Sequence, residues 1–454
     1  MRRTTHLKAV AALSAVALLA ACGGDEDGTA DDTTTAAEQT DDAAGTDDMA
    51  GETGDDMAGE TEGAGAGGDG NTGDTFTLGY ILPETGQLAF LGPPQITALG
   101  LAISDINDAG GVLGNEVPDA IAGDEAGQDT VAQASADRIL SQDVSAIVGA
   151  AASGMSLAVI DRITGAGVMQ CSGSNTAPTF TDYEDDGLYI RTAPSDALQG
   201  PVLANTIVND GWSNVAIVAR ADDYGRGLAD ATAEALENAG ATVALNETYD
   251  PNATEFNAAV ESVVSAEPDA VVVVAFEEGA QILQGLFEAG LTPESTGIYG
   301  ADGLRSGDLG SIVNESDPTI IAGMKGTAPA SADNPEFLDK LAEFDPELED
   351  TTFAPQVYDC VVTMALAAEA AGSVNAMDFK ESVNDVTQGG TECTSFEECR
   401  DLLADGEDID YNGASGPLDF TEAGEPGRAT IEVYEFDADG ELQSVETVES
   451  NPTE

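Results

Sequence analysis

Basic residues are scarce in this sequence. Lys and Arg together number 14 against 85 Asp and Glu, so the formal net charge of the 454-residue chain is −71. A chain this acidic repels nucleic acid and anionic lipid, and an anionic ligand would need a local positive site. The charge therefore argues against a nucleic-acid partner. It favours a strongly hydrated surface suited to salty surroundings, with a specific basic partner as the alternative.

Histidine and phosphate-binding motifs are also missing from the expected mature chain. The only histidine is His6, which lies in a segment expected to be removed. Without histidine there is no Ser-His-Asp triad and no imidazole ligand for zinc, and no glycine-rich Lys motif is present to cradle a phosphate. The sequence therefore predicts a protein that is not an enzyme, with no catalytic residue, no metal and no cofactor.

The apolar run near the N-terminus, at residues 9–20, is short. It follows three basic residues and is too short to span a bilayer as a stable helix. The run closes on a segment that resembles the lipobox of bacterial lipoproteins, Leu19-Ala20-Ala21-Cys22-Gly23. We therefore expect a signal peptide at 1–21, acyl chains on Cys22 and a lipid anchor on the extracytoplasmic face of the cell membrane. An ordinary secretory signal with a chance cysteine is the alternative.

Residues 22–74 form a low-complexity segment of Gly, Ala, Thr and acidic residues. The stretch 25–74 holds seventeen Asp and Glu, no Lys or Arg, and a short repeat at 47–53 and 55–61. No apolar face recurs at any period, so burial cannot offset the entropy of ordering, and like charges extend the chain. We expect a disordered tether between the lipid and the folded domain.

From residue 76 onward, short β-rich runs alternate with amphipathic helical runs, which is typical of βαβ units and parallel sheets. The expected strands cover residues 76–82, 144–148, 168–171, 215–218, 243–248, 270–275 and 297–299. The expected helices cover residues 94–109, 129–140, 155–164, 198–209, 226–239, 255–265 and 279–289. Two consecutive sets of such units predict two α/β lobes. Ligands of open parallel sheets bind beyond the carboxyl ends of the strands, so we expect the site in the cleft between the lobes.

Several ordered motifs give this pattern a family resemblance. They are Leu82-Pro83-Glu84-Thr85-Gly86 with Leu91-Gly92; Ile106-Asn107-Asp108-Ala109-Gly110-Gly111; Val148-Gly149 followed by Ser153; Ser174-Asn175-Thr176-Ala177-Pro178; Asp223-Tyr224-Gly225-Arg226-Gly227; Gly300-Ala301-Asp302-Gly303; and Tyr358-Asp359. In this order and spacing, the chain resembles the substrate-binding proteins of branched-chain amino acid ABC importers over residues 77–445.

The resemblance implies a type I periplasmic-binding-protein fold: two doubly wound parallel-sheet lobes, a ligand cleft and three hinge crossings. The first lobe would comprise 75–195 and return at 325–412. The second would comprise 196–324, with the C-terminal strands and tail at 413–454. A monomer is expected, whose closed and liganded form docks on the ABC permease subunits.

Hydroxyl groups near two helix starts are candidates for holding an amino acid. Ser153 and Thr176 offer side-chain hydroxyls and backbone N–H groups at helix N-termini, where the dipole favours an anion. Plain N-capping is the alternative for both. Ser174 would contribute main-chain groups. The resemblance aligns these three residues with the carboxylate- and ammonium-binding residues of the family.

The remaining residues of the ligand site are expected later in the chain. Asp302, where the family usually carries glutamate, would accept from the ligand ammonium, with an Asx turn as the alternative. Tyr224 matches the family tyrosine that closes over the ligand, with packing at a strand end as the alternative. Phe276 lies near another family aromatic, and Phe90 and Leu91 are candidates for the apolar side-chain pocket or for loop packing.

Four cysteines remain once Cys22 is assigned to lipid, and an even number in an exported domain indicates disulfides. Three pairings are possible. A local loop Cys393–Cys399 leaves Cys171–Cys360, and we predict that both form.

The sequence thus predicts a lipid-anchored solute receptor that captures an amino acid, with leucine, isoleucine or valine expected, for an ABC importer. One alternative keeps the fold and changes the ligand to an amide, urea, polyamine or aromatic compound. Another is a surface sensor that signals to a partner protein.

Overall fold

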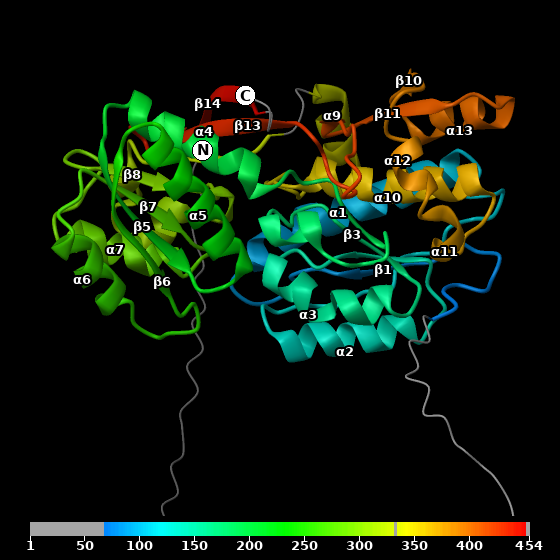
Figure 1. Cartoon of the computed structure of the whole chain (residues 1–454), viewed down its shortest axis with the longest axis horizontal. Helices are drawn as coiled ribbons and strands as arrows, with labels where there is room; N and C mark the ends of the chain where they lie inside the picture. Colours follow the sequence, from blue (N-terminus) through cyan, green and yellow to red (C-terminus); the bar gives the residue numbers. More distant parts are fainter. Residues whose placement is uncertain (1–67, 331–333, 451–454) are drawn as a thin grey trace, which may run out of the picture. The chain divides into compact units, whose positions relative to one another are not determined.

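The computed structural model describes residues 68–330 and 334–450, which belong to one compact unit. Within it two α/β lobes are each built around a central sheet (Figure 1). The signal peptide, most of the tether and the lipidation of Cys22 were expected at positions that lie outside the described residues.

The first lobe is a three-layer unit around a parallel sheet. Its four strands lie in the order β1-β2-β3-β4, with bounds Leu78–Ile81, Ala146–Gly149, Met169–Ser172 and Tyr189–Arg191. Helices α2 (Asp129–Leu140) and α3 (Ser153–Thr164) cover one face. Helices α1 (Gly92–Asp108) and α10 (Ala354–Ala371) cover the other (Figure 1). Because successive side chains of a strand point to opposite faces, Leu78 packs under α10 while Ile81 packs under α2.

The second lobe has a larger mixed sheet in the order β14-β13-β9-β8-β7-β5-β6. The strands β5 to β9 are parallel, and β13 and β14 are antiparallel additions; the bounds are Asn214–Arg220, Thr242–Tyr249, Ala270–Val274, Gly297–Gly300, Lys325–Pro329, Ala429–Phe436 and Leu442–Ser450. Helices α4 (Asp196–Asn209) and α5 (Asp223–Asn238) pack on one face, and α6 (Asn257–Ser265) and α7 (Gly279–Glu288) on the other. The continuous apolar run of β7 is fully buried, as a central parallel strand requires.

The remaining elements are short. Three small strands, β10 to β12 at Thr391–Cys393, Ile409–Gly413 and Gly416–Pro417, form a separate sheet. The other α-helices are α8 (Leu309–Val313), α9 (Pro335–Phe344), α11 (Ala376–Phe379), α12 (Ser382–Asp385) and α13 (Phe396–Asp405). Short 3₁₀ turns are η1 (Ala89–Leu91), η2 (Pro178–Asp182), η3 (Asp302–Leu304) and η4 (Pro318–Ile321).

The expected strands and helices are all present, with ends shifted by a few residues. The helix expected at 129–140 has these bounds in the structure. The two-lobed α/β architecture is confirmed.

Two of the expected lobe boundaries need correction. The first lobe was expected to resume at 325, but β9 pairs with β8 and β13 inside the second sheet, so the return comes after Pro329. The second lobe was expected to resume at 413, but β12 pairs with β11 beside α13, and the second-lobe sheet resumes only at Ala429. The chain therefore crosses between the lobes after β4, after β9 and before β13.

The start of the folded body also needs correction, because residues 68–74 were expected to belong to the tether. Gly68 and Gly70 donate backbone hydrogen bonds to Gly165 and Ala166. Asn71 is buried and its side-chain amide donates to Ser145 Oγ at 2.8 Å. These contacts hold the segment against α3, although its composition matches the acidic stretch before it.

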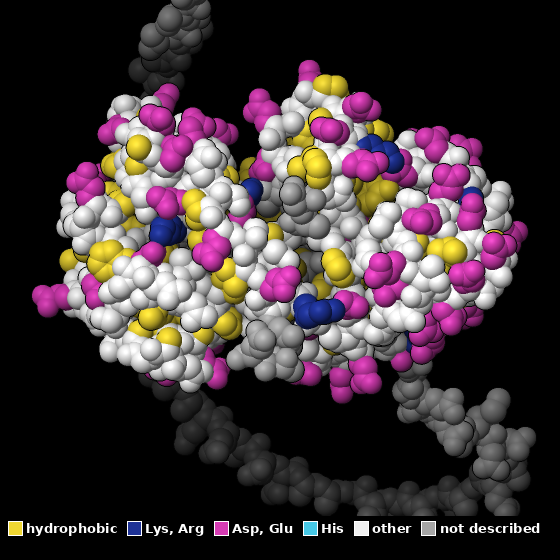
Figure 2. Space-filling model, turned by 90° about the horizontal axis from the view of Figure 1, so that it is seen from above, with side chains coloured by type: hydrophobic (Ala, Val, Ile, Leu, Met, Phe, Trp, Pro, Cys, Tyr) yellow, Lys and Arg dark blue, Asp and Glu magenta, His cyan; other side chains and the backbone are white. Residues whose placement is uncertain are grey.

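The surface is rich in acidic side chains, as the composition predicts. Figure 2 shows Asp and Glu side chains spread over the visible face of both lobes, with few Lys and Arg among them. Among the described residues, no helix combines the length and hydropathy needed to cross a bilayer. The same part of the chain has no cluster of three or more His, Cys, Asp and Glu side chains arranged to hold a metal ion.

Candidate ligand-binding site between the lobes

A small cavity lies between the two lobes, at the carboxyl ends of the parallel strands. The space in it that is open to a water-sized molecule is only about 10 Å³. Its lining residues are Leu88, Leu91, Ala151, Ala152, Ser153, Ser174 and Phe353 from the first lobe, and Tyr224, Phe276, Asp302 and Gly303 from the second. A cavity of this size holds at most about one water molecule. The two walls therefore lie close together, and a ligand would enter only if the cleft opened.

The first-lobe wall is the N-terminus of α3. Ser153 is the first residue of this helix, and Ala152 at the N-cap position makes no side-chain cap. The Ser153 hydroxyl oxygen accepts from Ala177 N at 3.4 Å, which leaves its own hydrogen available to donate. The first N–H groups of a helix have no partner within the helix, so this end of α3 can receive an anionic group. The alternative of plain capping by Ser153 does not hold.

Glu125 is a functional neighbour that the sequence did not suggest. Its carboxylate accepts from Ala151 N at 2.7 Å and from Ala152 N at 3.2 Å, just ahead of α3. The side chain is fully buried, and burial raises the pKa of this carboxyl to about 8. Glu125 therefore fixes the turn that presents Ser153. Its only sequence signal is an acidic pair, Asp124-Glu125, in the connection between α1 and α2.

Ser174 is close to the cavity but is already engaged. Its hydroxyl lies 3.1 Å from Gln95 Oε1 and 3.2 Å from Ala151 O, and it can donate to either. Its backbone N–H donates to Ser172 Oγ at 3.3 Å. The main-chain N–H that the sequence offered to a ligand is therefore used to shape the turn.

The second-lobe wall carries the predicted acid and tyrosine. Asp302 follows β8 and accepts from Tyr224 Oη at 3.0 Å and from Gln199 Nε2 at 2.9 Å. The Tyr224 hydroxyl in turn accepts from Gly303 N at 3.2 Å. Burial raises the pKa of Asp302 to about 6, partly offset by the two side-chain donors. The structure thus places these two predicted residues in contact.

Asp196 is a second buried acid that the sequence analysis missed. Thr176 Oγ1 donates to its Oδ2 at 3.0 Å, so the Thr176 hydroxyl does not act as a helix cap. Its Oδ1 is buried without a hydrogen-bond partner. Burial first, and then the charge of Asp302, raises the pKa of Asp196. No Lys or Arg of the described residues forms an ion pair with Asp196 or Asp302.

The aromatic wall is fixed by stacking. The rings of Phe276 and Tyr224 stack with centroids 5.4 Å apart, and the Arg220 guanidinium lies 3.5 Å from the Phe276 centroid. Arg220 also pairs with Glu278 at 2.9 Å, so its charge is largely satisfied within the second lobe. Phe276 therefore presents a rigid edge to the cavity.

Of the two apolar candidates in the first lobe, only one lines the cavity. Leu91 lines the cavity as expected, but Phe90 is not among the lining residues and packs against the core, so its assignment to the pocket is wrong. Leu88 and Phe353 take part instead. Phe353 has a φ of 60°, a strained left-handed conformation that places its ring at the start of α10. No pattern in the sequence indicates the left-handed conformation of Phe353.

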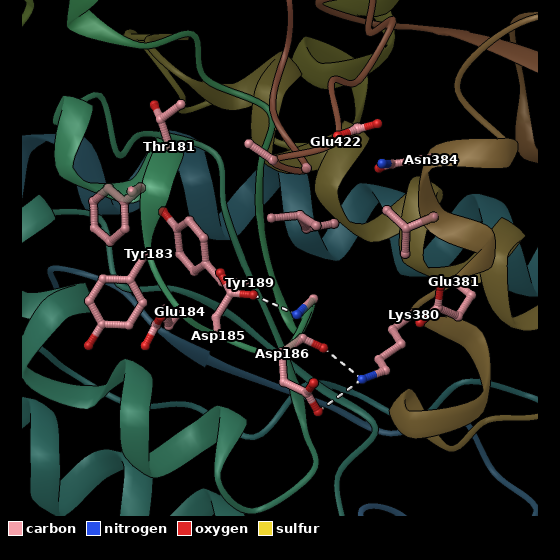
Figure 3. Close-up of a pocket in the computed structure, with 16 residues that line it drawn as sticks. Thr181, Tyr183, Glu184, Asp185, Asp186, Tyr189, Lys380, Glu381, Asn384 and Glu422 are labelled. Carbon is pink, nitrogen blue, oxygen red and sulfur yellow. Dashed lines mark hydrogen bonds and ion pairs between the residues drawn. The ribbon is translucent and has the colours of Figure 1, made fainter.

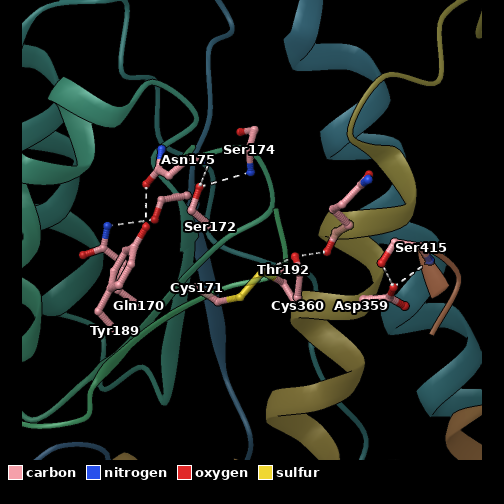
Figure 4. Close-up of a disulfide and its surroundings, with 12 residues drawn as sticks. Gln170, Cys171, Ser172, Ser174, Asn175, Tyr189, Thr192, Asp359, Cys360 and Ser415 are labelled. Carbon is pink, nitrogen blue, oxygen red and sulfur yellow. Dashed lines mark hydrogen bonds between the residues drawn. A yellow bond between two sulfur atoms is a disulfide. The ribbon is translucent and has the colours of Figure 1, made fainter. Parts of the chain in front are cut away.

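Both predicted disulfides are present. Cys171–Cys360 joins β3, just before the turn at Ser172, to α10 (Figure 4). Cys393–Cys399 closes a local loop between β10 and α13. The first bridge fixes the turn to the helix behind it. Ser172 and Asn175 add buried hydrogen bonds to Ala150 O at 2.8 and 3.1 Å.

A larger hollow lies elsewhere, on the first lobe. It measures about 500 Å³ and is lined by Tyr183, Tyr189 and several acids, with Lys380 bound to Asp186 across it (Figure 3). None of the predicted ligand residues lies there. Six of the eight predicted ligand residues line the cavity between the lobes, and the two that do not are Thr176 and Phe90.

This fold and this site define a two-lobed ligand-binding protein with its site in the cleft. The chain belongs to the family described as the receptor family ligand binding region, which matches residues 96–439.

Relatives and a solved structure agree with that assignment. The Leu/Ile/Val-binding protein BraC3 of Rhizobium johnstonii is 27% identical over 364 residues, 80% of this chain and 92% of the relative. The chemotactic signal transduction system substrate-binding protein BasB of Halobacterium salinarum is 27% identical over 370 residues, 78% and 85% of the two chains. The substrate-binding protein LivJ of Streptococcus pneumoniae, solved with isoleucine, superposes with a TM-score of 0.67 at 23% identity, covering 83% of this chain and 99% of that one. The fold is that of type I periplasmic binding proteins.

Proposed function

We propose that this protein captures an α-amino acid in the cleft between its lobes and delivers it to an ABC importer. The proposal rests on one observation: acidic groups on one wall of a small cavity face hydrogen-bond donors on the other. Asp302, and Asp196 behind it, form an acidic wall with no cationic partner. The N-terminus of α3 with Ser153 forms a wall of donors. A zwitterion with its ammonium on the acids and its carboxylate at α3 satisfies both walls.

The apolar part of the cavity selects the ligand side chain. Leu88, Leu91 and Phe353 contribute aliphatic and aromatic surface without a polar group. An aliphatic side chain would pack against this apolar surface once the cleft opened to admit it, and leucine, isoleucine and valine are the expected ligands. The names of the relatives and the isoleucine in the LivJ structure support the same class.

Delivery to a membrane transporter follows from the proposed export and anchoring. A signal peptide at 1–21 and acylation of Cys22 would hold the receptor at the extracytoplasmic face of the membrane, where its closed form would meet the permease subunits. Binding and release, without chemical conversion, complete this role. No cofactor is needed for it, and a monomer suffices.

Calorimetry with matched compounds tests this proposal. Leucine, isoleucine or valine is expected to bind and to raise the melting temperature, because a ligand of the native state stabilises it by mass action. 4-Methylpentanoate lacks the ammonium and 3-methylbutylamine lacks the carboxylate, so both are expected to bind far more weakly. Absence of binding by all proteinogenic amino acids, or equal binding of leucine and 4-methylpentanoate, would reject the proposal.

A sensory role for the same site is a second candidate. The relative BasB is named as part of a chemotactic signal transduction system, and it matches most of this chain. The ligand chemistry would be the same, and the partner would be a signalling protein. Copurification of the ligand-bound receptor with permease subunits from its own membrane would favour transport, and copurification with a chemotaxis transducer would favour sensing.

A further inference from the structure

Two of the contacts between the lobes lie outside the ligand cavity and on the side of α5 and β6. One is a close approach of α5 to the first lobe: Gly227 lies against Pro178, the first residue of η2. The other is a hydrogen bond from Gln87 Nε2, in the connection between β1 and α1, to Pro251 O, just after β6, at 2.9 Å. Each contact has one partner in each lobe, so opening the cleft would break both.

The contact between α5 and Pro178 is possible because Gly227 has no side chain. A Cβ atom at position 227 would lie 2.5 Å from Pro178 Cδ, well inside the contact distance of about 3.5–4.0 Å between carbon atoms. The proline ring is rigid, so it cannot turn aside as a flexible side chain could. Gly227 has no positive φ, so the position needs glycine for proximity and not for backbone conformation.

The contact also determines where Tyr224 lies. Tyr224 and Gly227 are three residues apart on α5 and therefore share one face of the helix. The same face brings the Tyr224 hydroxyl to Asp302 at 3.0 Å and its ring to the cavity wall. If α5 were held away from η2, the lobe that carries Tyr224 and Asp302 would not reach the α3 side of the cavity.

We propose that Gly227 and Gln87 are positioning residues for closure of the cleft. Because Gly227 has no side chain, α5 can pack directly against Pro178. The hydrogen bond of the Gln87 side chain then holds the two lobes together at a second point. Neither residue touches the cavity, so they act on the ligand through the lobe arrangement alone. This inference rests on the proposed binding function.

The variant Gly227→Ala separates closure from folding. Alanine is the better helix former, so the ligand-free protein is expected to melt at the same or a higher temperature. The added methyl group blocks the packing of α5 against Pro178, so amino-acid binding is expected to weaken by about tenfold or more, with a smaller ligand-induced rise in melting temperature. Gly307→Ala, at an exposed second-lobe glycine with open space around it, is the matched control and is expected to behave as the wild type.

The variant Gln87→Ala tests the hydrogen bond at the second point. It removes one hydrogen bond of the closed form, so ligand dissociation is expected to be about two- to tenfold faster. Gln133→Ala removes a similar glutamine-to-carbonyl bond within the first lobe and is expected to leave dissociation unchanged. A wild-type dissociation rate in Gln87→Ala would overturn the closing role of Gln87.

Hydrogen exchange on the full chain provides a readout that does not depend on the identity of the ligand. Amides in 179–182 and 223–228 are expected to exchange faster in Gly227→Ala than in the wild type or in Gly307→Ala. If no amino acid binds the wild type, the proposed function fails, and this exchange difference still tests the contact. Equal exchange in all three proteins, or full affinity in Gly227→Ala, would overturn the closing role of Gly227.

Discussion

Thr176 donates its hydroxyl to Asp196 at 3.0 Å, across the first connection between the lobes. This bond turns a threonine of the first-lobe turn toward an acid at the start of α4. It holds one oxygen of Asp196 and leaves the other buried and unpaired, beside the charge of Asp302. Among the described residues, no Lys or Arg forms an ion pair with either acid.

Removing either charge is expected to affect binding and folding in opposite directions. In Asp302→Asn, amino-acid affinity should fall by about 30-fold or more, because the ligand ammonium loses a buried ionic partner. The ligand-free protein should be more resistant to urea, because repulsion between two buried carboxylates is relieved. Asp196→Asn should show the same pair of effects.

Calorimetry and urea unfolding of these variants measure both quantities. Asp119→Asn, at an exposed position of the first lobe, is the control and should alter neither. Full affinity in both Asp302→Asn and Asp196→Asn would remove the acids from the binding site.

Amino-acid binding is expected to weaken in mildly acidic solution. The pKa of Asp302 is raised to about 6 in the ligand-free protein, so this carboxyl becomes protonated as the pH falls through that value. An ammonium prefers the ionised form, so binding should release a proton near pH 6 and affinity should decline below it. Titration calorimetry in two buffers with different ionisation enthalpies measures the release. A pH-independent affinity between pH 5 and 7.5 would contradict this account.

Stability of the ligand-free protein is expected to fall as the pH rises toward 8. Glu125 has a pKa of about 8 in the folded protein, above the ordinary value of 4.5, so the folded state binds its proton more tightly than the unfolded state. Stability is therefore lost between these two values as the pH rises. Urea midpoints should decline over that interval, and less steeply in Glu125→Gln. Parallel slopes for the wild type and Glu125→Gln would show that Glu125 is not responsible.

The two disulfides are expected to contribute unequally to stability. Their cysteines are 189 and 6 residues apart, so chain-entropy reasoning gives about 5 kcal/mol for Cys171–Cys360 and about 2 kcal/mol for Cys393–Cys399. Double replacement by serine, Cys171→Ser with Cys360→Ser, should therefore lower the free energy of unfolding more than the pair Cys393→Ser with Cys399→Ser. Urea unfolding of the two double variants checks this, and the reverse order would refute it.

The sequence predicts most of the framework because its signals are local. Apolar period, glycine stops and cysteine spacing located the strands, the helices and both disulfides. Tyr224, Asp302 and Ser153 could be chosen because each follows an expected strand and lies in a motif that carries the family resemblance. The boundary at 325 was misplaced because β9 is a short strand whose partners, β8 and β13, lie on either side of it in the sheet and far apart in the chain.

The site residues that the sequence did not reveal have contacts with residues far away in the chain. Asp196 reads as the first residue of an ordinary helix, and only the fold brings it to Thr176 and Asp302. Glu125 reads as one acid among 85, and its role comes from the backbone of residues 151 and 152. Phe90 and Leu88 are separated by one residue, so a local pattern could not decide which of them faces the cavity.

The bridge between Cys171 and Cys360 closes a covalent ring of chain that contains the second lobe except for β13 and β14. Every residue of the chain between β4 and β9 lies inside that ring. A protease that cuts the chain once between β4 and β9 would therefore leave the two fragments joined, and only a reducing agent would let them separate on a denaturing gel. A cut in the connection between β13 and β14, outside the ring, would release the C-terminal fragment without reduction.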